Sequence, residues 1–244
     1  TGNMVLGWSK TQGKNTLSSS DYKAGDRIPT KNGKYYMVIF GMSMDRAPSV
    51  ITKATKFEKV YCVGDSRTAD TKMALGVAVP SNVEFIAKWG EDLYWFKSTG
   101  YRQLLSSVSK QPKNSKKAVI INLGVNDLNN GRAYVTYMKK VAANLKKYNC
   151  KMYYLSVNPV NSAMIKSVGG KARSEAQIAS FNRTIYKNLC SGKNKSFTYI
   201  NSCTNLQMKG WISNRHDMGI YDGLHYSNAT YLRIFDYCMR YLNR

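Results

Sequence analysis

Three short segments of the chain carry side chains suited to acid–base and nucleophilic chemistry. Gly64-Asp65-Ser66-Arg67 offers a serine hydroxyl, Gly124-Val125-Asn126-Asp127 an amide, and Asp222-Gly223-Leu224-His225 a carboxylate close to an imidazole. A serine hydroxyl becomes a useful nucleophile when a base takes its proton, and histidine can do so near neutral pH. A neighbouring aspartate would orient that histidine and stabilise its charged form. These residue types predict acyl transfer.

Each segment also has a commoner structural explanation when it is taken alone. A Gly-Asp-Ser turn most often caps a helix, with Asp65 or Ser66 as the N-cap residue. Asn126-Asp127 after a strand is usually an ordinary turn, and a lone loop histidine is more often a surface residue than a base. The chemistry therefore requires that the fold bring all three segments to one place.

The predicted secondary structure places the segments where they could meet. Short apolar runs predict five buried strands, at 59–64, 82–89, 117–124, 150–158 and 196–201. Helical patterns alternate with them, at 68–77, 92–108, 132–148, 174–190 and 229–242. This alternation predicts a parallel sheet covered by helices on both faces, with ligands bound beyond the carboxyl ends of the strands. Ser66 and Asn126 follow the first and third strands, and His225 precedes the last helix.

The order and placement of the three segments resemble the SGNH (GDSL) hydrolase family over residues about 59–244. The resemblance implies an α/β fold, a flavodoxin-like three-layer α/β/α sandwich with a parallel five-stranded sheet. It also implies a serine esterase of the carboxylic ester hydrolase class that needs no metal or other cofactor. Carried over residue by residue, the family's Ser-Asp-His triad corresponds to Ser66, Asp222 and His225.

The same resemblance implies an oxyanion hole, a set of hydrogen-bond donors for the negative oxygen of the reaction intermediate. The Ser66 N–H and the Asn126 side-chain amide match two of the family's donors. The third is a glycine N–H, assigned to Gly90 because it follows the second strand and precedes a helix, with Gly100 as the alternative. Arg67 stands where the family has an aliphatic residue, and is either a surface salt bridge or a fixed cation beside the nucleophile.

Other residues near these segments have a structural and a functional interpretation. His216 either supports the long loop before His225 or contacts substrate. Tyr94, Trp95 and Phe96 either belong to the core or form a platform on which a sugar ring stacks. Asp65 and Asp127 are expected to brace loops rather than act as acids.

Residues 1–56 differ in composition from the hydrolase region, 57–244, and predict a small β-rich segment. They are rich in Lys, Ser, Thr and Gly, with one strand-like run at 35–40. Part of this segment resembles the second half of an internalin-type B-repeat, in Gly7, Trp8, Tyr22, Gly25, Asp26 and the strand-like run. Because such repeats occur in bacterial surface proteins, the resemblance implies a secreted or cell-surface protein.

The composition adds expectations about partners. The chain has 37 Lys and Arg against 14 Asp and Glu, a formal net charge of +23, which favours polyanions such as an anionic cell-wall polymer. The basic residues are spread along the chain without the motif of a nucleic-acid-binding module, so no nucleic acid partner is expected. No apolar run is long enough to span a membrane. Of the five cysteines, one disulfide could form among Cys190, Cys203 and Cys238.

We therefore expect an esterase that removes acyl groups, above all O-acetyl groups, from a carbohydrate or cell-surface polymer. One alternative is a lysophospholipase or a hydrolase of broad acyl-ester specificity. The other is a catalytically silent glycan-binding surface module, which the complete set of Ser66, Asp222 and His225 argues against.

Overall fold

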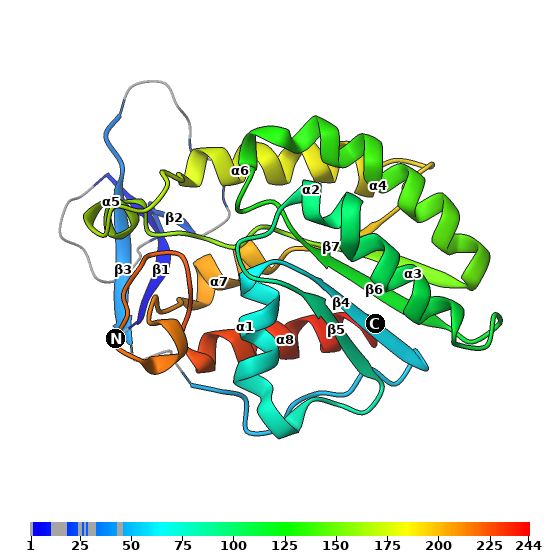
Figure 1. Ribbon diagram of the computed structural model, residues 1–244. Coiled ribbons are helices and arrows are strands. Elements are labelled where there is room, and N and C mark those ends of the chain that lie inside the picture. Colours follow the sequence, from blue (N-terminus) through cyan, green and yellow to red (C-terminus); the bar gives the residue numbers. More distant parts are fainter. Residues whose placement is uncertain (1, 11–18, 24–25, 27, 29–32, 43–45) are drawn as a thin grey trace.

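A computed structural model describes residues 2–10, 19–23, 26, 28, 33–42 and 46–244 (Figure 1). Its centre is a five-stranded parallel sheet of order β5-β4-β6-β7-β8, which is the flavodoxin-like order. The strands are β4 (Lys59–Gly64), β5 (Val83–Ala87), β6 (Lys117–Asn122), β7 (Cys150–Leu155) and β8 (Thr198–Ile200). The predicted sheet and its parallel direction are therefore confirmed.

Helices cover both faces of this sheet, because the side chains of each strand alternate between two apolar cores. In β4, Tyr61 and Val63 join one core, whereas Val60 and Cys62 join the other. The helices α3, α4 and α6 pack on the first face and α1 and α8 on the second (Figure 1). Their bounds are α1 (Ser66–Leu75), α3 (Tyr101–Ser109), α4 (Gly131–Leu145), α6 (Glu175–Ile185) and α8 (Asn228–Leu242).

The predicted helix over 92–108 is present as one continuous helical run over 93–109, which contains a π-helical turn. A short α2 (Leu93–Trp95) leads through a π-helical turn (Phe96–Gly100) into α3. The structure also has two short helices that the sequence patterns did not predict, α5 (Ser162–Ser167) and α7 (Ser202–Lys209). Across the described residues, no helix is long and apolar enough to cross a membrane.

The amino-terminal segment forms a second, antiparallel sheet of order β2-β1-β3. Its strands are β1 (Gly2–Ser9), β2 (Tyr22–Lys23) and β3 (Tyr36–Met42), so β3 corresponds to the predicted strand-like run. β1 lies against α7, and the connection into β4 is tied to α8 through the Thr52 N–H and the Asp236 carboxylate (3.0 Å). Gly25, one of the repeat-like residues, lies outside the described residues. The resemblance to a B-repeat and the boundary at residue 56 stay predictions.

All five cysteines are buried free thiols, so the disulfide considered among Cys190, Cys203 and Cys238 is absent. These three residues lie at the end of the π-helical turn after α6, on α7 and on α8. Burial raises the pKa of the Cys190 and Cys203 thiols to about 12, which leaves them protonated and unreactive.

Candidate active site

Ser66 is the first residue of α1, directly after β4, at the carboxyl end of the sheet. The chain can turn this sharply because Gly64 has no side chain: a Cβ there would lie 2.0 Å from Thr68 Oγ1 and 2.4 Å from the Asn122 carbonyl oxygen. Asp65 caps the helix, and its carboxylate accepts the Arg67 N–H (3.0 Å). Burial raises the pKa of Asp65 to about 7 although Arg67 lowers it. The capping interpretation of Asp65 thus holds, and the cap presents Ser66 at the sheet edge.

Ser66, His225 and Asp222 form one row of hydrogen bonds. His225 Nε2 lies 2.9 Å from Ser66 Oγ, and His225 Nδ1 lies 2.6 Å from Asp222 Oδ2. The other carboxylate oxygen of Asp222 accepts the backbone N–H groups of Leu224 (2.8 Å) and His225 (2.7 Å). The loop thus folds around the carboxylate and fixes the imidazole between the acid and the hydroxyl.

The electrostatics of the Asp222 carboxylate suit this arrangement. Burial alone would raise its pKa, but the hydrogen bonds from the His225 ring and from the His225 and Leu224 N–H groups hold the pKa at about 2. The carboxylate is therefore ionised throughout the neutral range. Its contribution to the stability of the folded protein is lost only as the pH falls towards 2. An ionised Asp222 keeps a proton on Nδ1 of His225, which leaves Nε2 free to accept the proton of Ser66.

Asn126 and Gly90 lie at the ends of the two strands that flank β4. The Asn126 side-chain amide donates to the Glu91 carbonyl oxygen (2.8 Å), which joins its loop to the turn that contains Gly90. Gly90 has a φ of +76°, a conformation that favours glycine, and a Cβ there would meet no atom within 4 Å. Gly100 instead lies buried in the π-helical turn, where a Cβ would come within 2.8 Å of the Trp95 ring. Packing therefore explains Gly100, whereas Gly90 directly precedes Glu91, the residue that the Asn126 amide contacts.

Arg67 is not the surface salt bridge considered from the sequence. Its side chain is buried, with the residue 2% exposed, and the guanidinium lies 4.8 Å from the Tyr226 ring centre. It donates to the carbonyl oxygens of Asn158 (2.8 Å), Pro159 (3.0 Å) and Leu224 (2.9 and 3.1 Å). Arg67 therefore joins the loop after β7 to the loop of Asp222 and His225, and so stabilises the position of these two residues.

Replacement of Arg67 by methionine is expected to lower the free energy of unfolding by about 3 kcal/mol or more, because three carbonyl groups lose their donors. Chemical denaturation measures this loss. The matched control is Arg102→Met on the exposed face of α3, which should change stability by less than ~0.5 kcal/mol. Equal stability losses in the two variants would contradict the structural role of Arg67.

Asp70 is a supporting residue that the sequence patterns did not reveal. It lies one turn after Ser66 on α1, fully buried, and accepts the Trp89 indole N–H (2.6 Å) and the Tyr231 hydroxyl (3.0 Å). His216 Nε2 lies 3.1 Å from the same Asp70 oxygen that Trp89 contacts. Asp70 therefore holds the turn before Gly90 and the loop before Asp222 together. His216 supports this loop, in agreement with its structural interpretation.

The aromatic cluster after Gly90 divides between core and surface. Trp95 and Phe96 are buried in the core, whereas Tyr94 is 79% exposed. Trp89, on the other side of Gly90, is 53% exposed although its indole N–H is held by Asp70. The aromatic side chains of this segment that are available to a ligand are therefore Tyr94 and Trp89.

Asp127 braces its loop as expected, because its carboxylate accepts the Tyr134 hydroxyl (2.7 Å).

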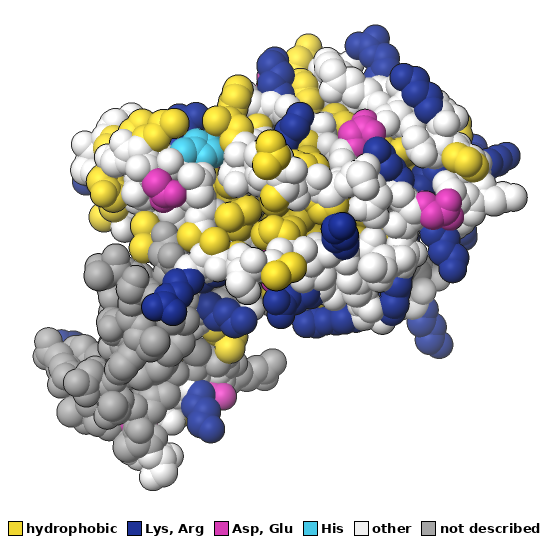
Figure 2. Space-filling view, turned by 90° about the horizontal axis from the view of Figure 1, so that it is seen from below, with side chains coloured by type: hydrophobic (Ala, Val, Ile, Leu, Met, Phe, Trp, Pro, Cys, Tyr) yellow, Lys and Arg dark blue, Asp and Glu magenta, His cyan; other side chains and the backbone are white. Residues whose placement is uncertain are grey.

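Charged side chains are distributed broadly over one face of the molecule. On the face shown in Figure 2, Lys and Arg are scattered around a group of hydrophobic side chains and do not form one stripe. The basic side chains are thus spread over this face, in line with the spread of basic residues along the sequence.

Comparisons with known proteins show the family of the chain and the fold that it shares with solved structures. Residues 60–238 match the family model of GDSL-like lipases and acylhydrolases. No curated protein matches the sequence. The fold is similar to a GDSL-like lipase from Bacteroides thetaiotaomicron VPI-5482, with 17% identity over 76% of this chain and 87% of that chain and a TM-score of 0.57.

Two further solved structures share the fold. A protein from Bacteroides fragilis NCTC 9343, described as an acylhydrolase, has 15% identity over 80% of this chain and 91% of that chain, with a TM-score of 0.55. A protein from Slackia heliotrinireducens, described as an SGNH hydrolase, has 13% identity over 75% of this chain and 98% of that chain, with a TM-score of 0.53. At these identities the structures establish the common fold.

Proposed function

The chain belongs to the GDSL-like lipase and acylhydrolase family, and from this we propose that it is a serine esterase that removes O-acetyl or other short acyl groups from carbohydrate. The observation that carries the proposal is the row of hydrogen bonds from Ser66 through His225 to Asp222. The row supplies a nucleophile, a base and an anion that orients the base, which are the groups that acyl transfer needs.

In the proposed reaction, Ser66 Oγ attacks the ester carbonyl carbon while His225 Nε2 takes the hydroxyl proton. The negative oxygen of the tetrahedral intermediate is stabilised by the Ser66 N–H, the Gly90 N–H and the Asn126 amide. His225 then gives its proton to the departing alcohol oxygen, which leaves the acyl group on Ser66. A water molecule, deprotonated by His225, attacks the carbonyl carbon of this acyl-enzyme. His225 then returns the proton to Ser66 Oγ as the bond to the acyl group breaks and the acid is released.

A carbohydrate substrate is proposed because two exposed aromatic side chains lie near Gly90 in the sequence and because the chain is strongly basic. Tyr94 and Trp89 flank Gly90 in sequence and offer ring faces to a sugar. The net charge of +23 favours a negatively charged polymer as the substrate or its neighbour. Together with the repeat-like segment, this charge leads us to propose a secreted or cell-surface enzyme of bacteria.

The test compares ester hydrolysis on substrates that differ in acyl chain and carrier. We expect kcat/KM on p-nitrophenyl acetate to exceed that on the dodecanoate by at least about tenfold, and acetate to be released from an acetylated polysaccharide. The Ser66→Ala variant is the control for background hydrolysis. A preference for the dodecanoate or for lysophospholipid would favour the lipid-hydrolase alternative. Glycan binding without any Ser66-dependent hydrolysis would favour the silent surface module.

A further inference from the structure

We propose that Arg173 is a positioning residue of the oxyanion hole, which fixes and polarises the side-chain amide of Asn126. This inference rests on the proposed function, because it assigns to Asn126 the oxyanion of ester hydrolysis. Arg173 lies between Gly170 and the start of α6, in a loop for which the sequence patterns predicted no role.

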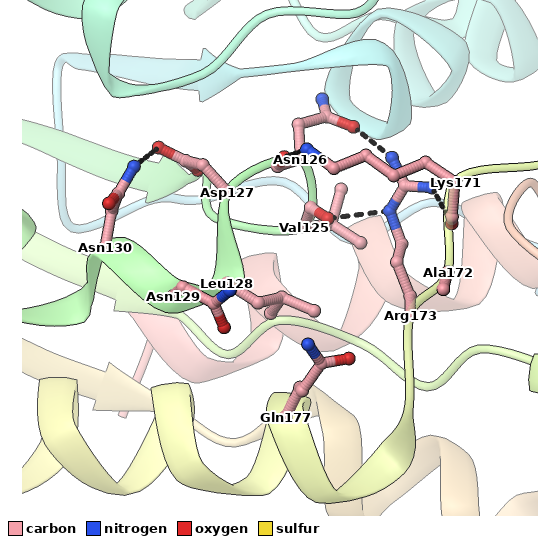
Figure 3. Close-up of a pocket in the computed structure, with 10 residues that line it drawn as sticks. All are labelled: Val125, Asn126, Asp127, Leu128, Asn129, Asn130, Lys171, Ala172, Arg173 and Gln177. Atoms are coloured by element: carbon pink, nitrogen blue, oxygen red, sulfur yellow. Dashed lines mark hydrogen bonds between the residues drawn. The ribbon is translucent and has the colours of Figure 1, made fainter.

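The guanidinium holds both the side chain and the backbone of the Asn126 loop (Figure 3). Its Nη2 donates to Asn126 Oδ1 (2.8 Å) and its Nε donates to the Val125 carbonyl oxygen (2.8 Å). Its Nη1 donates to the Lys171 carbonyl oxygen (2.9 Å), while Lys171 Nζ donates to the Asn126 carbonyl oxygen (3.0 Å). A planar, forked cation is suited to such paired contacts, and a lysine could not make all of them.

These contacts determine which way the Asn126 amide faces. Its Oδ1 accepts from Arg173 and its Nδ2 donates to the Glu91 carbonyl oxygen. A flipped amide would set its NH₂ group against the Arg173 donors and its oxygen against the Glu91 carbonyl, so both partners oppose the flip. Since Nδ2 carries two N–H groups and one is bound to Glu91, the other remains for the oxyanion. The donor is thus oriented before the substrate arrives.

The charge of Arg173 also strengthens this donor. A cation on the amide oxygen draws electron density from the nitrogen, which makes the remaining N–H a better donor to a negative oxygen. Arg173 is half-buried. Burial lowers the pKa of its guanidinium most, and the nearby Arg67 lowers it further, whereas the carboxylates of Asp65 and Asp222 raise it. An arginine stays protonated throughout the neutral range despite such a shift, so the polarising charge is always present.

The backbone that follows Arg173 is held by hydrogen bonds, because the next residues begin a helix with a double cap. Ser174 Oγ accepts the Gln177 N–H (3.2 Å), and Gln177 Oε1 accepts the Ser174 N–H (3.0 Å), which is the capping-box arrangement. A cavity of about 270 Å³ lies beside the guanidinium, lined on one side by the Asn126 loop and on the other by Lys171, Ala172 and Arg173 (Figure 3). A truncated side chain at position 173 would therefore leave room for water instead of forcing a collapse.

The test is a double-mutant cycle of Arg173→Met and Asn126→Ala on p-nitrophenyl acetate. We expect Arg173→Met to lower kcat by about 10- to 100-fold, with KM within about threefold, because the donor acts on the transition state. In the Asn126→Ala background, the same substitution should lower kcat by less than about threefold. Arg173→Lys, which keeps the charge but not the fork, should fall between wild type and Arg173→Met.

The matched control is Arg132→Ala, an exposed arginine on α4 close to the same loop, which should leave kcat unchanged. Effects of Arg173→Met and Asn126→Ala that multiply, or a loss confined to KM, would overturn the inference. Thermal melts of all variants establish that they are folded. Failure of the proposed function is a separate result: Ser66→Ala would then keep wild-type turnover, whereas failure of this inference leaves Ser66→Ala inactive and Arg173→Met active.

Discussion

Replacement of Ser66 by alanine is expected to lower kcat on p-nitrophenyl acetate by about 10⁴- to 10⁶-fold and to leave the fold intact. The hydroxyl lies 2.9 Å from His225 Nε2, and no other group can replace its attack on the ester carbonyl. His225→Ala should cause a loss of similar size, because Ser66 without its base is a poor nucleophile. Initial rates at saturating substrate measure both losses, and Ser106→Ala on the exposed face of α3 is the control.

The double variant Ser66→Ala/His225→Ala should be little worse than either single variant, because the two residues act as one unit. Asp222→Ala should be less severe, since its carboxylate orients and stabilises the base but does not itself react. Losses that multiply in the double variant would contradict the assignment of one proton-transfer unit.

Replacement of Asn126 by alanine is expected to lower kcat by about 100- to 1000-fold, or about 3–4 kcal/mol of transition-state stabilisation. KM should change little, because the amide matters chiefly once negative charge develops on the substrate oxygen. Steady-state kinetics on p-nitrophenyl acetate separate the two constants. Asn129→Ala, an exposed asparagine of the same loop, is the control and should keep wild-type turnover. A rise in KM at unchanged kcat would show that Asn126 only binds the ground state.

The fold was predictable because the sequence repeats one simple pattern. Apolar runs such as 59–64 and 117–124 alternate with helical patterns, and all five predicted strands are present in one parallel sheet. The family assignment was predictable for a related reason: each of its motifs is short and lies at a strand end or before the last helix. The structure brings Ser66, Asp222 and His225 together although Ser66 and His225 are 159 residues apart in the chain.

The residues that support the site could not be predicted, because their roles depend on contacts distant in sequence. Arg67 reads as a surface cation, yet it donates to Leu224, 157 residues away, and is buried by that loop. Asp70 looks like an ordinary polar residue of an amphipathic helix, and only the fold brings Trp89 and His216 to its carboxylate. The contact of Arg173 with Asn126 similarly needs the loop before α6 to return to the end of β6.

Local sequence patterns also missed details within and between the helices. The run 92–108 forms one continuous helix, but the pattern did not predict the π-helical turn at Phe96–Gly100, where Gly100 packs closely on Trp95. The short helices α5 and α7 have too few residues for a clear periodicity. None of these differences affects the carboxyl ends of β4 and β6, so the predicted positions of Ser66 and Asn126 do not depend on them.

Ser66 is expected to form a covalent acyl-enzyme, and the most direct measurement is trapping of that residue. The enzyme is incubated with a p-nitrophenyl phosphonate ester, and the intact protein and its peptides are weighed by mass spectrometry. We expect one phosphonyl group per chain, located on Ser66, with p-nitrophenol release and loss of esterase activity in equal proportion, and no label in His225→Ala over the same time. Full esterase activity in unlabelled protein, or a label on a residue other than Ser66, would contradict the role of Ser66 as the nucleophile.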